Sequence, residues 1–430
     1  MRGRLFKIAL FCCAIMLCSC SNEDKEKNTE NRVENEEVQN TLDSAVSAIE
    51  YKNQYYKNRV SILKCITNYK SDVEAIRALE SNVLSFDSCE FAPIDKLETV
   101  MELKVEKQDI TPADSLAAIK RWLKRSKIND IDTDKEIRDS GGEYESDVSK
   151  KYPYSFPAVS KYYPDFETGN SFFINTKRCY ILMNAGGVYS MSDGIIAKYL
   201  GSKSRAEADV FYGEDAETVA EGKVSELADK SWELLSGKMT VKTAADLTKR
   251  YFEQGIFLPC AKDVTVDVPE VKVFRLKDKY GYMFRLRRVY QEIPFAYISS
   301  YGEIYSIKNS VDGDDRMAYV VNGQTVNACL GSDSESEEVI PEGEAQDYIV
   351  SIQEAVSILE KNLIPQEIIE IDETVDIEEV GFVYCPCWYS DRKKNVYPCW
   401  EFRGKLGSNQ DELNLYVNAL NGEIYSYGCR

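Results

Sequence analysis

Histidine is absent from this chain of 430 residues. Its absence excludes serine and cysteine hydrolases that depend on a histidine base, and it excludes zinc and iron sites with histidine ligands. A pH sensor that relies on imidazole is excluded for the same reason. The sequence shows no catalytic signature of another kind. We therefore expect a protein that is not an enzyme, with no catalytic residue, no cofactor and no metal site.

Basic side chains are scarce relative to acidic ones. Lysine and arginine number 53 against 72 aspartates and glutamates, which gives a formal net charge of −19. Proteins that bind nucleic acid cluster lysine and arginine against the phosphates, so we expect no nucleic-acid partner. Beyond the first twenty residues, no run of eighteen apolar residues occurs. The sequence therefore predicts no membrane-spanning segment after this leader.

The first twenty residues have the pattern of a bacterial lipoprotein signal. A basic start precedes an apolar run over residues 5–17, and Leu17-Cys18-Ser19-Cys20 resembles a lipobox. The resemblance implies that residues 1–19 are removed as a signal peptide and that Cys20, the new N-terminus, carries the lipid. Since one acyl chain binds marginally and several bind firmly, this lipid would hold the protein in the membrane. We expect a lipoprotein of the cell membrane, anchored on its extracytoplasmic face; the alternatives are an uncleaved anchor and a chance cysteine-rich leader.

The residues that follow the leader differ sharply from the rest of the chain. Residues 20–40 contain almost no aliphatic side chains and many charged ones, which predicts a disordered tether. Residues 41–110 combine helical patterning with short apolar runs and are interpreted as an N-terminal helical or mixed region.

Three later segments end in the same pattern of glycine, an aliphatic residue, tyrosine and serine. Each follows a run that alternates like a half-buried strand, so the glycine is expected to make the turn into a returning strand. A helix is predicted upstream of each run, and each opens with the N-cap to N3 spacing of a capping box. The patterns lie at residues 186–190, 302–306 and 422–426, and the capping pairs are Thr111 with Asp114, Thr243 with Asp246, and Ser351 with Glu354. The sequence predicts an α+β fold in which a capped helix packs on a small antiparallel sheet, three times over.

Three short motifs in the last unit are similar to those of a known domain family. Residues 351–359 resemble the opening helix of PepSY-like domains, residues 396–402 resemble the Pro-x-Trp strand of their extracytoplasmic regulator relatives, and residues 418–424 resemble the closing strand. The resemblance implies tandem PepSY-like units, and we place them at residues 111–200, 240–330 and 345–430.

PepSY-like units occur in proteins that restrain membrane sensor kinases, in spore-germination partner proteins and in protease propeptides. The resemblance therefore implies binding rather than turnover. We expect a non-enzymatic binding and regulatory module for an envelope protein partner. The alternative is an envelope glycan-binding protein or a carboxylate-dependent hydrolase, because the tyrosines and prolines of residues 152–164 favour peptide or glycan contact. A solute-binding lipoprotein would need two lobes with parallel sheets, which the predicted antiparallel strands oppose.

Cysteines are densest in the last unit. Nine follow Cys20, an odd number, so at least one thiol should lie outside any disulfide. Cys385, Cys387, Cys399 and Cys429 form a cluster that we interpret as disulfides or buried thiols, because the protein is expected to work in an oxidising compartment. A redox pair and a four-thiolate metal site remain alternatives, although the spacing is not that of paired C-x₂-C ligands.

The lipoprotein signal gives the first testable prediction. We expect wild-type protein in the native host to incorporate an alkyne-tagged palmitate and to lose residues 1–19. Cys20→Ser should abolish the label and leave the full-length precursor, whereas Cys18→Ser, as a matched control, should retain both labelling and cleavage. Intact mass and gel fluorescence measure the two effects. Unchanged labelling of the Cys20 variant would contradict lipidation at this residue.

Overall fold

The computed structural model describes residues 57–107, 112–127, 172–175, 179–183, 189–200, 216–253, 264–296, 316–331, 337–390, 393–407 and 411–428. All of these from Asn58 onward belong to one compact unit. The predicted signal peptide, the tether and Cys20 lie outside the described residues. None of the helices within these ranges is long and apolar enough to cross a bilayer.

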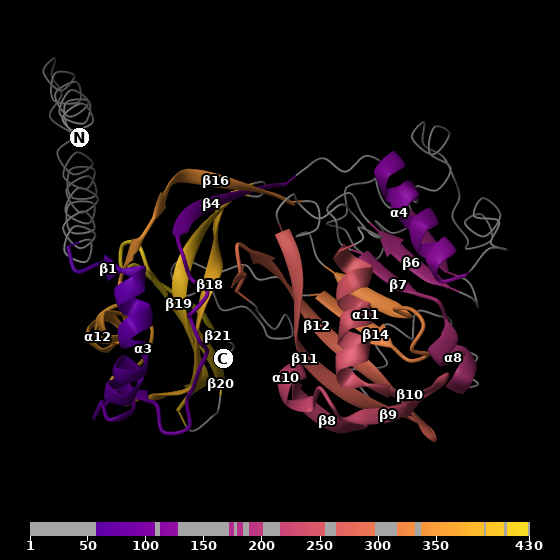
Figure 1. The fold of residues 1–430 in the computed structure, drawn as a ribbon, viewed down its shortest axis with the longest axis horizontal. Coiled ribbons are helices and arrows are strands. Elements are labelled where there is room, and N and C mark those ends of the chain that lie inside the picture. Colours follow the sequence, from indigo (N-terminus) through magenta and orange to yellow (C-terminus); the bar gives the residue numbers. More distant parts are fainter. Residues whose placement is uncertain are drawn as a thin grey trace, which may run out of the picture. The chain divides into compact units, whose positions relative to one another are not determined.

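Two large sheets, each with helices packed against it, make up the described structure (Figure 1). The first sheet has nine strands. In spatial order they are β5 (Phe172–Asn175), β6 (Tyr180–Met183), β7 (Tyr189–Ser192), β15 (Ala328–Gly331), β14 (Arg316–Val320), β12 (Lys279–Tyr290), β11 (Val264–Leu276) and β8 (Thr218–Lys223), with β13 (Ile293–Pro294) beside β12. Every pairing in this sheet is antiparallel.

Apolar side chains on both faces of the first sheet explain its helices. One face packs under α4 (Pro112–Arg125) and α11 (Val241–Glu253), where Trp122 and Phe252 are buried with Val271 and Phe284 of the strands. The opposite face packs against α8 (Ile195–Leu200). The remaining elements of this part are α10 (Val224–Leu227) and the hairpin of β9 (Ser231–Leu234) and β10 (Gly237–Thr240).

The second sheet has eight strands. Its main order is β16 (Glu337–Gln346), β4 (Val100–Lys107), β19 (Lys393–Leu406), β18 (Val375–Ser390) and β2 (Leu84–Ser85), with β20 (Asp411–Asn418) beside β19, β21 (Ile424–Gly428) beside β20, and β3 (Glu90–Phe91) beside β18. The short strands β2 and β3 run parallel to β18, and the other pairings are antiparallel.

A buried tryptophan joins the second sheet to its helices. Trp400 donates its indole N–H to the Val350 carbonyl at 2.8 Å and stacks on Tyr69 with ring centroids 6.4 Å apart. Tyr69 belongs to α3 (Ile62–Arg77), and Val350 lies just before α12 (Ile352–Asn362). A pair of two-residue strands, β1 (Val60–Ser61) and β17 (Tyr348–Ile349), leads into these helices. The Trp400 of the predicted Pro-x-Trp strand is therefore a packing residue.

The capped helix of the last unit is confirmed. Ser351 is the N-cap of α12 and its hydroxyl accepts the Glu354 N–H at 3.2 Å. An apolar stripe along this helix and just after it is buried as well, at Ile352, Ala355, Val356, Leu359 and Leu363. The first predicted helix is present as α4, although Thr111 lies outside the described residues.

The second capping pair was placed one turn too late. Helix α11 begins at Val241, so Thr243 and Asp246 lie inside its first turns. The Thr240 hydroxyl accepts a hydrogen bond from the Thr243 N–H at 3.2 Å. Thr240 therefore caps the helix in the role predicted for Thr243. A β-hydroxyl residue stands at both positions, and only the preceding hairpin of β9 and β10 decides where the helix begins.

The prediction of a mixed protein with helices and mainly antiparallel strands is confirmed. The prediction of three small, separate sheets is wrong, because most of the described strands form two large sheets. β7, from residues 111–200, pairs with β15, from residues 240–330, so both segments build one sheet. β2, β3 and β4, from residues 41–110, join the sheet of residues 345–430. A strand left at an edge exposes unpaired backbone groups, and joining neighbouring segments removes such edges.

The glycine turns of the repeated pattern are only partly described. At the last copy, Gly422 has a φ of 75°, which favours glycine, and the chain returns as β21 beside β20. At the first copy, Tyr189 and Ser190 open β7, which returns along β6. The second copy lies outside the described residues.

Helix α12 offers a matched pair of variants for testing the cap. Ser351→Ala removes the acceptor for the Glu354 N–H and should lower the free energy of unfolding by about 1 kcal/mol. Ser357→Ala changes a half-buried serine in the middle of the same helix and should stay within about 0.5 kcal/mol of wild type. Urea unfolding followed by circular dichroism measures both. Equal effects of the two substitutions would contradict the capping role.

Candidate functional site: a charged cleft between the two sheets

Charged side chains occupy one face of the second sheet. Strand alternation places Trp400 and Phe402 on the face under α3 and α12, and it places Glu401 and Arg403 on the opposite face. Arg403 stands directly opposite Glu379 of β18, and Glu401 stands opposite Gly381. The two strands thus present carboxylates and a guanidinium side by side.

A bulge in β18 aligns Glu379 with Arg403. The register shifts between Ile377 and Glu379, so that Gly404 faces Ile377 and Arg403 faces Glu379. The chains approach closely here, because a Cβ on Gly404 would lie 2.3 Å from the Asp376 carbonyl oxygen. Only glycine fits this position, and the bulge that aligns the ion pair depends on it.

The first sheet supplies a second set of charges, on adjacent strands β11 and β12. Asp267 faces Arg287 across the strands and binds its Nε at 3.1 Å. Glu270 faces Arg285 and binds it at 3.5 Å. A bulge in β11 separates the two pairs. Each pair is a direct cross-strand ion pair of the kind that stabilises antiparallel sheets.

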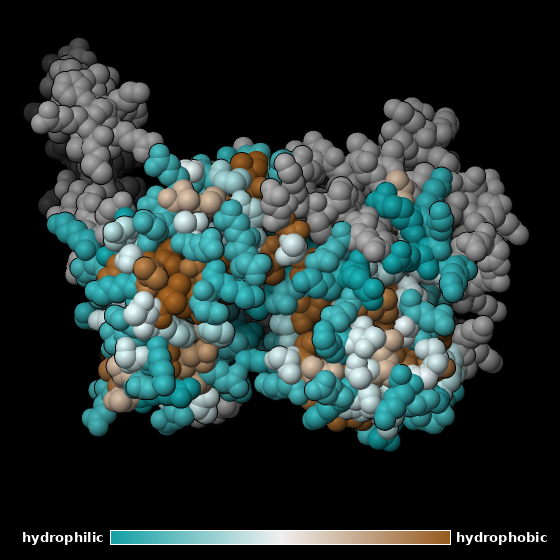
Figure 2. All heavy atoms as spheres, viewed as in Figure 1, coloured by the Kyte–Doolittle hydropathy of each residue, from teal (hydrophilic) through white to brown (hydrophobic). Residues whose placement is uncertain are grey.

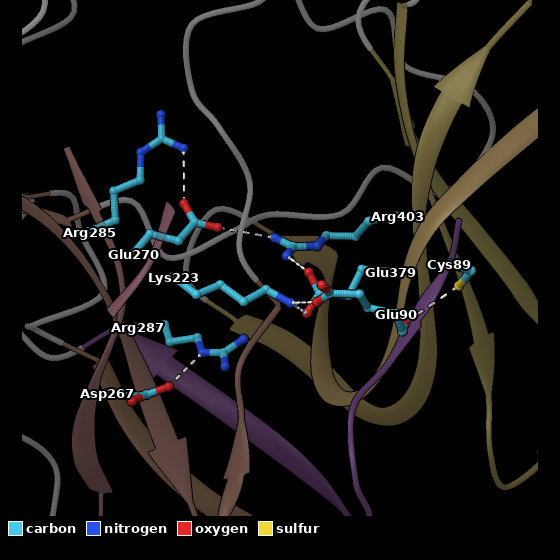
Figure 3. A network of polar contacts seen from close by, with 9 residues as sticks. All are labelled: Cys89, Glu90, Lys223, Asp267, Glu270, Arg285, Arg287, Glu379 and Arg403. Atoms are coloured by element: carbon cyan, nitrogen blue, oxygen red, sulfur yellow. Dashed lines mark hydrogen bonds and ion pairs between the residues drawn. The ribbon is translucent and has the colours of Figure 1, made fainter. Parts of the chain in front are cut away.

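Two basic residues link the sheets. Lys223, at the end of β8, binds Glu379 at 3.2 Å and also binds Glu90 of β3. Arg403 binds Glu379 and reaches Glu270 of β11 at 3.6 Å. Figure 3 shows the resulting network, with Arg403 between carboxylates of both sheets.

The charged state of this network follows from its pairings. Burial acts to raise the pKa of Glu379, but Arg403 and Lys223 outweigh it and hold that pKa below its usual value. Burial acts to lower the pKa of Lys223, and Glu90 and Glu379 outweigh it and raise that pKa. The pKa of Arg403 is raised against burial by Glu401, Glu379 and Glu270. These groups therefore remain ionised at neutral pH.

Glu401 differs from its neighbours. Its side chain is buried, at 5% exposure, and its Oε1 has no hydrogen-bond partner within the described residues. Burial raises the pKa of this carboxyl, and the nearby Arg403 and Arg287 act against that shift. Two glutamates on one sheet face thus have pKa values shifted in opposite directions.

The junction of the sheets is hollow. A cavity of about 520 Å³ is lined by residues of both sheets and by α10 and α11, among them Lys223, Glu270, Arg287, Glu379 and Arg403. Figure 2 shows a hollowed, mainly hydrophilic surface in this region. Nowhere in the described ranges do three or more histidine, cysteine or acidic side chains converge in a way that could hold a metal ion.

The predicted cysteine cluster is partly described. Cys385 and Cys399 are both buried in one apolar cluster with Val383 and Tyr416, on the sheet face that also carries Glu401. The side chain of Cys387, and Cys429 altogether, lie outside what the structure describes. The disulfide cluster therefore stays a prediction, as does the lipidation of Cys20.

No pattern in the sequence predicted the charged network. Acidic residues are so common in this chain that no pair of them stands out. The spacing of Glu401 and Arg403 could have indicated the network. Side chains two residues apart in a strand lie on the same face, so both charged groups lie on one face of a strand where apolar residues are expected. Its partners Glu90, Lys223 and Glu270 come from distant segments that no local pattern connects.

Comparisons with known proteins identify no family and no function for this chain. No protein-family model matches the chain, and no curated protein matches it. A crystal structure of an uncharacterized protein from Eubacterium rectale resembles it with a TM-score of 0.38 and 12% sequence identity, over 76% of this chain and 86% of that one. These comparisons assign no chemistry to the cleft, and the PepSY-like resemblance stays a prediction.

Glu379 and Glu401 should respond to substitution in opposite ways. Glu379→Gln leaves Arg403 and Lys223 undercompensated and should lower the free energy of unfolding by about 1–3 kcal/mol at pH 8. Glu401→Gln removes a carboxylate whose ionisation burial disfavours and should raise stability at that pH. Urea unfolding at pH 5 and pH 8 measures both variants.

The pH dependence has a defined sign for each residue. The folded pKa of Glu379 is lowered, so its contribution is present above the unfolded pKa near 4.3 and is lost as pH falls through the folded value. The folded pKa of Glu401 is raised, so wild-type stability declines as pH rises from about 4.3 through that value, and Glu401→Gln should abolish this decline. Shifts of the same sign in both variants at pH 8 would contradict the assignment.

Proposed function

We propose that this protein is a lipid-anchored, extracytoplasmic binding and regulatory module that recognises an envelope protein partner and does not transform it. The observation that carries the proposal is the hollow at the junction of the sheets, whose ionised walls are already paired with one another. Glu379 has a lowered pKa and two cationic partners, so it is poorly suited to donate a proton. Walls of this kind favour recognition of a polar segment.

The order of elements supports the finer proposal of three PepSY-like repeats. Helix α4 precedes β5, β6 and β7, helix α11 precedes β11 and β12, and helix α12 precedes β18, β19, β20 and β21. The strands within each segment are antiparallel neighbours. Both sheets are antiparallel along most of their pairings, which argues against a solute-binding protein built on parallel sheets.

One observation favours the alternative of a glycan-binding protein or a carboxylate-dependent hydrolase. Glu401 and Glu379 have pKa values shifted apart, as a general acid and its partner carboxylate require. Glu401, however, is buried and is not among the residues that line the cavity. A group of this kind must touch its substrate, so binding without turnover remains the preferred proposal.

Photo-crosslinking in cells tests the proposed function. A photoreactive residue at Ser225, an exposed position that lines the cavity, should capture one envelope protein repeatedly, as identified by mass spectrometry. The same residue at Ile371, which is 80% exposed and is not among the residues that line this cavity, is the matched control and should not capture it. Capture of cell-wall fragments from Ser225, or no difference between the positions, would contradict a protein partner in the cleft.

A further inference from the structure

Three neighbouring hollows lie along the junction of the sheets, and together we call them the groove. The cavity of about 520 Å³ shares Asp267 and Arg287 with a neighbouring hollow of about 450 Å³, which extends along residues 92–97 and β12. At its other end it shares Glu270, Glu379 and Arg403 with a hollow of about 230 Å³. Neighbouring hollows that share walls in this way suit an extended ligand better than a compact one.

The backbone of β11 forms part of the groove wall. Strand β8 pairs with β11 only from Glu270 onward, so the segment Val264–Pro269 has a strand partner on one side alone within the described residues. Residues of this segment line both large hollows. The Val268 N–H is already bonded to Asp267 Oδ1, and Pro269 has no N–H. Residues 264–267 can therefore offer backbone groups to an extended chain, as in strand addition.

Arg287 stands where the two larger hollows meet. Its Nε binds Asp267, and its two terminal nitrogens have no partner in the described part of the chain. Its side chain is 22% exposed, and Figure 3 shows the guanidinium extending toward the middle of the network. A guanidinium presents two parallel N–H donors to a carboxylate, and partial burial strengthens such a pair.

We propose that this groove binds an extended peptide segment of the partner protein and that Arg287 binds a carboxylate side chain of that segment in a bidentate pair. The inference rests on the proposed function, and it adds that the partner presents an extended segment with an acidic side chain. Alanine, valine and proline side chains line the groove between the charges, including Val224, Ala245 and Pro269. Such walls contact a peptide chain, whereas among the described residues that line the groove only Phe382 offers an aromatic ring as a surface for a sugar ring.

Peptide selection tests this inference. The full lipidated protein in detergent is incubated with a random library of eight-residue peptides, and bound peptides are sequenced. We expect enrichment of peptides with one aspartate or glutamate at a fixed position. For the best peptide, Arg287→Gln should weaken binding about ten- to hundred-fold, and Arg287→Lys should lose most of the same affinity because lysine cannot bind bidentately.

A double-mutant cycle separates direct contact from loss of fold. Replacing the selected acidic residue of the peptide by its amide should weaken binding to wild-type protein and should have no further effect on Arg287→Gln. Arg275→Gln is the matched control, because Arg275 binds Glu217 outside the three hollows, and it should bind like wild type. Thermal unfolding verifies that each variant is folded.

The outcomes distinguish the inference from the proposed function. Selected peptides without an acidic preference, or peptides whose affinity is unchanged in Arg287→Gln, would overturn the role of Arg287 and leave the protein-binding proposal intact. Binding of cell-wall oligosaccharides with no peptide selected would overturn both. Coupling between Arg287 and the peptide carboxylate, with Arg275→Gln unaffected, would support both.

Discussion

The junction of the two sheets depends on charge compensation of the Arg403 guanidinium, which is mostly buried. A cation removed from water costs several kcal/mol unless carboxylates surround it. Glu379, opposite on β18, compensates it within its own sheet, and Glu270 compensates it from β11 of the other. Lys223 meets the same requirement with Glu379 and Glu90. Contact between the sheets is thus a matter of matched charge as much as of apolar packing.

This kind of contact bears on the proposal that the junction binds a partner. Apolar surfaces that meet exclude water and close tightly, whereas charged walls remain hydrated and leave hollows between them. Many apolar side chains of each sheet pack on its own helices, as with Trp400 under α3 and Val271 under α11, and a smaller aromatic contact joins Phe295 to Tyr384 across the junction. The faces left for the junction carry the ion pairs, the spare nitrogens of Arg287 and the buried Glu401.

Local features were predictable where one short segment decides them. The cap at Ser351 and the buried stripe of α12 need only their own sequence, and so does the returning hairpin at Gly422. The start of α11 was misplaced because Thr240 and Thr243 are equivalent as caps, and the preceding hairpin chooses between them. Sheet size was missed because the pairing of β7 with β15 joins residues far apart in the chain.

By itself the sequence determined the absence of histidine chemistry, the acidic charge, the pattern of helices followed by strands, and a leader that predicts lipid attachment. Tertiary structure alone decided which of the 72 acidic residues join the ion-pair network between the sheets. Glu90, Glu270 and Glu379 look alike in sequence, since a carboxylate acquires its ionic partners only from the groups that the fold places around it. Those groups come from β3, β8, β11, β18 and β19, and only the folded chain brings these strands together.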